Sequence, residues 1–84
     1  MTRFQIKTFE REAVVFDTVS GDTHFLAPLT VALFQIIQNN PGMTADEIES
    51  TLAARLFLQT SPQFTRMTDE AIISLRRIGL LAPP

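Results

Sequence analysis

The stretch that most constrains the fold runs from Val14 to Pro28, VVFDTVSGDTHFLAP. Its apolar pieces, VVF and THFL, are rich in β-branched and aromatic residues, which favour strands. Between them, Ser20, Gly21 and Asp22 favour a turn, and a glycine-containing connection of this length is typical of a β-hairpin. Pro28 cannot donate to a strand ladder but suits the first turn of a helix. The stretch therefore predicts two antiparallel strands that lead directly into a helix.

Both faces of this hairpin have apolar character. In its second strand, Thr23, Phe25 and Ala27 share one face, and His24 and Leu26 share the other. Helices of the same chain can cover one face of a small sheet, which leaves the other face or the free edge for a second contact. The simplest occupant is the N-terminus of the chain or a second copy of it, and a bound peptide is the alternative.

Length and composition predict a single domain over residues 1–84. A hydrophobic content of 45% is too high for a disordered chain. The absence of cysteine excludes disulfide scaffolds and thiolate chemistry. The first twelve residues lack an apolar signal region, and no apolar run approaches the ~20 residues of a transmembrane helix. We therefore expect a cytoplasmic protein that does not enter a membrane.

Three further segments have helical signals, and one has a strand signal. FQIKTF, residues Phe4–Phe9, alternates apolar and polar residues and predicts an edge strand. Leu29–Gln38 predicts a first helix that is apolar nearly all round and therefore central. Its expected core stripe is Leu29, Ala32, Leu33, Ile36 and Ile37. The run Asn39–Gly42, NNPG, ends that helix.

The second and third helices are predicted from their caps. Thr44 followed by Glu47 fits a capping box, in which each side chain bonds the backbone of the other residue. Ser61 and Pro62 suit the N-cap and the first position of a third helix, and Gly79 suits its end. The expected core stripe of this third helix is Phe64, Met67, Ala71, Leu75 and Ile78. Three helices packed on a short three-stranded antiparallel sheet are typical of a winged-helix-like α+β domain.

The residues offer no catalytic constellation. His24 is the only histidine, and a general base needs an orienting partner and a nucleophile within reach. Three scattered glycines form no phosphate-binding loop, and one histidine with carboxylates is a poor transition-metal site. The acidic residues Asp46, Glu47 and Glu49 are explained by the positive end of a helix dipole. We expect neither an enzyme nor a cofactor or metal.

Three classes of binding protein remain open at this point. In a DNA-binding winged helix, the third helix would begin with Gln63, Thr65, Arg66, Asp69 and Glu70. Two carboxylates facing phosphates and a net charge of −2 argue against this class.

In a peptide-binding module, an extended guest chain would add to the edge of the second hairpin strand. The expected contacts on that strand are Thr23, His24, Phe25 and Leu26, and those on the third helix are Ile72, Leu75, Arg76 and Gly79. A homodimer that pairs the same edges and binds no peptide is the remaining alternative.

Several pieces of the sequence together resemble a known family. They are SGDTHFLAPL followed by an apolar helix, GMTADEIESTLA, and a closing helix that ends in RRIGLL. The chain from about Val14 to Leu81 resembles PqqD-like proteins, and is most similar to the small peptide-chaperone-like members encoded beside HPr-kinase-related proteins. Residues 1–12 depart from the pattern of the family.

The resemblance implies a RiPP recognition element, an accessory protein of peptide biosynthesis. In that family, three strands precede three helices in a winged-helix arrangement. The leader of a precursor peptide adds to the third strand as a further antiparallel strand, beside the third helix, and is presented to a modifying enzyme. Carried onto this chain, the docking strand is Thr23–Leu26.

Overall fold

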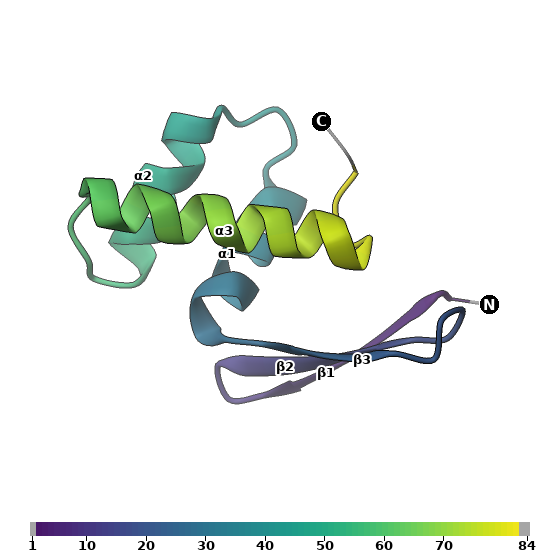
Figure 1. The fold of residues 1–84 in the computed structure, drawn as a ribbon. Helices are drawn as coiled ribbons and strands as arrows, with labels where there is room; N and C mark the ends of the chain where they lie inside the picture. Colours follow the sequence, from purple (N-terminus) through teal and green to yellow (C-terminus); the bar gives the residue numbers. More distant parts are fainter. Residues whose placement is uncertain (1, 83–84) are drawn as a thin grey trace.

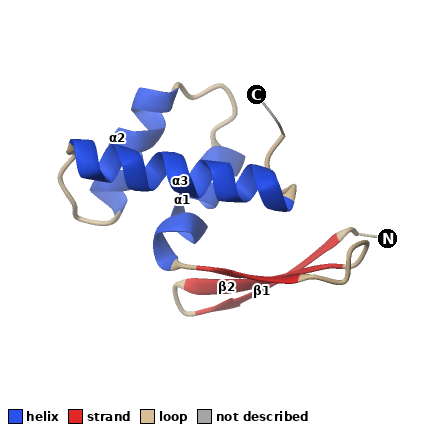
Figure 2. Cartoon of the chain, in the orientation of Figure 1, coloured by secondary structure: helices blue, strands red, loops and turns tan. Residues whose placement is uncertain are grey.

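Three strands precede three helices along the chain (Figure 1; Figure 2). The computed structural model describes residues 2–82. Its elements are β1 (Phe4–Phe9), β2 (Glu12–Asp17), β3 (Thr23–Leu26), α1 (Pro28–Asn39), α2 (Ala45–Arg55) and α3 (Pro62–Ile78). The predicted α+β class, with a short three-stranded antiparallel sheet followed by three helices, is confirmed.

The sheet has the order β1-β2-β3, with both pairs of neighbours antiparallel. Val15 of β2 lies between Ile6 of β1 and His24 of β3. The N-terminal strand therefore pairs with β2, on the side away from β3. Within residues 2–82, this arrangement leaves β1 and β3 as the two edge strands, so the N-terminal strand β1 does not cover the β3 edge.

The core lies between the sheet and α1, which packs on β2, α2 and α3. Ala13 and Val15 of β2 and Leu26 of β3 are buried on the side that faces the helices. Leu33 of α1 is fully buried, and Phe34, which lies outside the expected core stripe, is buried as well. The prediction that the first helix is apolar nearly all round and central is confirmed. The helices lie on one side of the sheet (Figure 1), and Phe9, Phe16 and Phe25 are exposed on its other side.

The predicted caps set the ends of α2 and α3. The Thr44 side chain accepts from the Glu47 amide at 3.2 Å, and Glu47 accepts in return from the Thr44 amide at 3.3 Å. Ser61 accepts from the Phe64 amide at 3.1 Å, with proline at the next position. Gly79 ends α3 in the left-handed region, at φ 101°, which favours glycine.

The core face of α3 differs from the expected stripe at one position. Met67 is 44% exposed, and Thr68 is buried in its place. The Thr68 hydroxyl donates to the Phe64 carbonyl at 3.0 Å, so the buried polar group keeps a hydrogen bond within its own helix. Among residues 2–82, no helix has both the length and the apolar character needed to cross a bilayer.

Candidate functional site

The outer edge of β3 is not paired with any other strand of residues 2–82. The amide of Asp17 donates to the Asp22 carbonyl at 2.9 Å, so Asp17 and Asp22 begin the ladder that joins β2 to β3. Hydrogen-bonded pairs alternate along an antiparallel ladder, which makes His24 the next residue of β3 to bond β2. The amides and carbonyls of Thr23 and Phe25 therefore point to the free edge, where an added strand could bond them.

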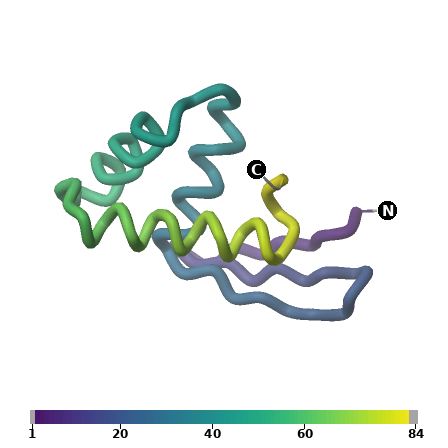
Figure 3. The backbone as a smooth tube through the Cα atoms, turned by 45° about the horizontal axis from the view of Figure 1, so that its top comes forward, coloured from purple at the N-terminus to yellow at the C-terminus, as the bar shows by residue number. Residues whose placement is uncertain are grey.

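A groove of about 460 Å³ lies between this edge and α3. We call it the β3–α3 groove. Its walls come from β3, the start of α1 and the last turns of α3, and α3 runs alongside β3 (Figure 3). The lining residues are Thr23, His24, Phe25, Leu26, Ala27, Thr30, Ser74, Arg77 and Ile78. An unpaired strand edge and a partly apolar groove thus lie side by side.

The four strand residues predicted for the site all line the groove. Thr23 and Phe25 lie on the exposed face of the sheet, and Phe25 is 65% exposed. His24 and Leu26 lie on the helix-facing side, where His24 is half-buried and Leu26 is buried. The strand therefore presents one half-buried polar residue and one exposed aromatic ring beside its free backbone groups.

The four helix residues predicted for the site do not line the groove. Leu75 is fully buried in the core and has no surface to offer. Gly79 lies on the β1 side, where a side chain would meet the Phe4 ring at 3.4 Å. Ile72 is partly buried against the core, and Arg76 is exposed outside the groove.

The helix wall is formed by Ser74, Arg77 and Ile78. At about 100° per residue, these three positions lie on the side of α3 opposite to Ile72 and Arg76. The sequence does contain a signal against one of the predicted wall residues. Leu75 belongs to the predicted core stripe, and a residue that faces the core cannot also line an exterior groove.

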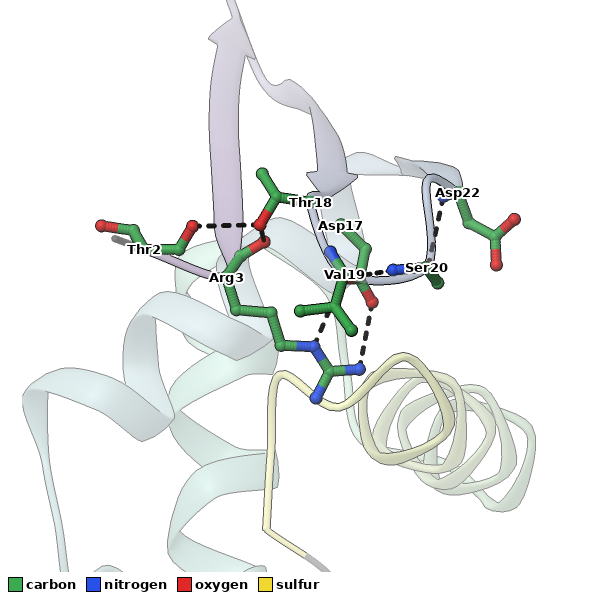
Figure 4. A network of polar contacts seen from close by, with 7 residues as sticks. All are labelled: Thr2, Arg3, Asp17, Thr18, Val19, Ser20 and Asp22. Carbon is green, nitrogen blue, oxygen red and sulfur yellow. Dashed lines mark hydrogen bonds and ion pairs between the residues drawn. The ribbon is translucent and has the colours of Figure 1, made fainter.

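The β2–β3 turn positions the start of β3 and is built around Asp17. Arg3 binds the Asp17 carboxylate through Nε at 3.3 Å and through Nη2 at 3.0 Å. The amides of Val19 and Ser20 also donate to Asp17 Oδ1, at 2.9 and 3.3 Å. Figure 4 shows the guanidinium and the carboxylate directed toward each other, with Thr18 bonded to the backbone at Arg3. The hydrogen bond from Arg3, followed by those from the turn amides, holds the pKa of Asp17 well below its ordinary value, although burial acts in the opposite direction.

The ionisable groups that line the groove are His24 and Arg77. The ion pair between Arg3 and Asp17 is the only one within residues 2–82, so Arg77 has no carboxylate partner there.

A second hollow, of about 300 Å³, shares Thr30 and Ser74 with the groove and extends it along α3.

A separate hollow of about 360 Å³ lies near the β1–β2 turn, between α1 and the end of α2. It contains Arg11 and Glu10, together with Arg55, which donates to Gln35 at 2.9 Å. None of the residues that line this hollow lies in a strand, so the hollow is separate from the free edges of the sheet. Within residues 2–82, no group of three or more histidine, aspartate or glutamate residues lies close enough to hold a metal ion.

No protein-family model matches this chain. No curated protein matches it. No solved structure matches it either. The β3–α3 groove and the free edge of β3 therefore remain the features of the chain that indicate a function.

Proposed function

We propose that this chain is a non-enzymatic recognition module that binds an extended peptide and presents it to a modifying enzyme. The peptide adds to the outer edge of β3 as a further strand of the sheet. The observation that carries the proposal is the unpaired backbone of Thr23 and Phe25 beside the β3–α3 groove. Strand addition uses the two parts of such a site, a free ladder for affinity and adjacent pockets for specificity.

The guest chain would divide its side chains between two surfaces. Every second side chain would face α3 and contact the groove near Leu26 and Ile78. The others would lie beside Phe25, on the exposed face of the sheet. Each main-chain hydrogen bond contributes about 0.5–1.5 kcal/mol net, so specificity depends on the side chains that enter the groove.

The resemblance to PqqD-like proteins supports the same strand. It implies docking at Thr23–Leu26, and the geometry offers a free edge there. On this proposal, the guest is a segment of a precursor peptide and the partner is the enzyme that modifies it. The proposed compartment is the cytoplasm, which fractionation of expressing cells would test.

The test uses peptides selected from a displayed library of random linear sequences against the wild-type chain. Phe25→Pro removes an edge-facing amide that β2 does not use, and edge strands tolerate proline when its position faces outward. We expect this variant to stay folded and to bind the selected peptides about tenfold more weakly, the loss expected for one unmade hydrogen bond. Phe25→Ala is the matched control, because it also removes the ring but keeps the amide.

The two variants separate the backbone contribution from that of the ring. A folded Phe25→Pro protein that binds the selected peptides as tightly as Phe25→Ala would overturn the edge assignment. Circular dichroism and urea unfolding establish that the variant is folded.

The homodimer alternative uses the same edge and gives a different result. Light scattering over a series of concentrations would show a dimer in the wild type that is lost in Phe25→Pro. That outcome, without peptide binding, would make a second copy the occupant of the edge.

A further inference from the structure

The β3–α3 groove and the second hollow that extends it along α3 carry opposite charges. Arg77 and His24 line the part beside β3. Glu70 and Met67 line the second hollow, which continues from Thr30 and Ser74. The helix separates Glu70 from Arg77 by seven residues, or about 10 Å along its axis. A peptide strand bound along α3 would therefore lie beside the acidic Glu70 at one end and the basic Arg77 at the other.

The contacts of α3 show where its basic and its acidic residues lie relative to β3. Gly79, at the end of α3, lies against Phe4, whose partner in β2 is Asp17. The basic end therefore lies near the β2–β3 turn and the start of β3. The acidic end lies near the start of α1, because Leu29 and Thr30 line the same hollow as Glu70.

We propose that the bound segment has an acidic side chain on its helix-facing side, paired with Arg77, and no acidic side chain beside Glu70. This inference rests on the proposed strand addition and specifies its substrate class. Arg77 is exposed and has no carboxylate partner in residues 2–82, so a guest carboxylate would supply the missing charge. No carboxylate lines the part of the groove next to β3, so nothing there competes for Arg77.

The spacing of a strand fits the two charges. Helix-facing side chains of an extended chain recur about every 7 Å, so Glu70 and Arg77 lie one or two such positions apart. Antiparallel addition is the slightly more stable mode. In that orientation the guest would meet Glu70 first and Arg77 later, which places its acidic residue toward its C-terminal end.

Arg76 provides a matched control within the same turn of the helix. Arg76 and Arg77 are both exposed in the last turn of α3, but only Arg77 lines the groove. Arg76→Glu and Arg77→Glu change the net charge equally and disturb the helix dipole alike. A difference between them in peptide binding therefore reports the groove and not the overall charge.

The experiment selects linear peptides from the same random library against three proteins: the wild type, Arg77→Glu and Arg76→Glu. We expect wild-type selections to be enriched in Asp or Glu at one helix-facing position, and Arg77→Glu selections to have Lys or Arg there. Wild-type peptides should bind Arg77→Glu about tenfold more weakly and Arg76→Glu unchanged. Replacing the acidic residue of a selected peptide by its amide should weaken binding to the wild type and leave binding to Arg77→Glu unchanged or stronger.

The outcomes distinguish this inference from the proposed function. Two results would overturn the pairing with Arg77 and leave strand addition intact. In both, the selected peptides bind Phe25→Pro more weakly than the wild type. They then either carry no acidic residue or bind Arg76→Glu and Arg77→Glu equally well. Failure of the wild type to select any peptide would overturn both. The comparison of a selected peptide with its amide-substituted form on the wild-type protein involves no variant, so this part of the test does not depend on the folding of one.

Discussion

Asp17 is the residue on which the position of the β3 edge most depends. It is 2% exposed, yet it ends β2 and holds the turn that leads to β3. A buried carboxylate is tolerated there because Arg3 and the amides of Val19 and Ser20 all donate to it. These contacts connect residue 3 to the turn, so the start of β1 and the start of β3 are held together.

The lowered pKa of Asp17 predicts an acid-sensitive fold. The carboxylate form is favoured in the folded chain, so the pKa of Asp17 in the folded chain lies below the ordinary aspartate value of 3.8. The stabilisation is fully present above that value and is lost as the pH falls through the folded pKa. We expect Asp17→Asn to lower the urea midpoint at about pH 7, and the difference from the wild type to shrink as the pH falls below about 4.

Asp22→Asn is the control for this prediction, because it removes one carboxylate from the same turn. The Arg3 and turn-amide contacts are to the carboxylate of Asp17, and Asp22 contributes its backbone to the turn. Equal effects of the two substitutions at every pH would contradict the role given to Asp17.

Single residues also show why the helix wall of the groove was not predicted. The choice between Arg76 and Arg77 depends on helix phase, and neighbouring residues differ by about 100° around the axis. The buried Leu75 marks the face of α3 that meets the core, but both arginines lie well away from that face, and only the folded chain places Arg77 in the groove and Arg76 outside it. The strand residues were easier to predict, because alternation has only two possible faces.

At the scale of elements, the caps of α2 are the clearest local determinant of structure. Thr44→Ala removes the hydroxyl that accepts from the Glu47 amide. We expect it to lower the free energy of unfolding by about 1 kcal/mol, measured by urea titration. Thr51→Ala is the matched control, since Thr51 is exposed within the same helix and alanine favours a helix interior. If Thr44→Ala costs no more than Thr51→Ala, the capping box is not formed in solution.

The sequence predicts most element types because its local signals agree. The bounds of β1 and β3 were predicted directly from alternation and from the turn and proline that flank β3. Pairing was harder to predict, because nothing in FQIKTF specifies which side of β2 it joins. The core face of α3 was also misjudged at Met67, since a threonine that bonds its own helix can replace an apolar residue in a core.

At the scale of the whole molecule, two surfaces of the sheet that residues 2–82 leave uncovered meet at Phe25. One is the β3 edge, and the other is the exposed face that carries Phe9, Phe16 and Phe25. Phe25 belongs to both, so a strand added at the edge would extend this face. A guest side chain beside Phe25 would cover part of an aromatic surface that the helices leave open.

The distribution of charge leads to a prediction about DNA. The third helix of a DNA-binding winged helix would face phosphates with its first turns, and here that surface carries Asp69 and Glu70. Glu49 of α2 accepts a hydrogen bond from Thr65, which adds a third carboxylate beside them. With a net charge of −2 for the chain, few counterions would be released on contact with a duplex.

We therefore expect no measurable binding of a generic DNA duplex at low salt, by fluorescence anisotropy under conditions where selected peptides bind. Any residual signal should fall little as salt is raised, because the slope of affinity against salt reflects the number of phosphates neutralised. The control is Asp69→Lys combined with Glu70→Lys, which converts the same surface to a basic one and should bind duplex with a steep salt dependence. Tight, steeply salt-dependent binding by the wild type would show that cations elsewhere on the chain contact phosphates, and would favour the DNA-binding class over peptide recognition.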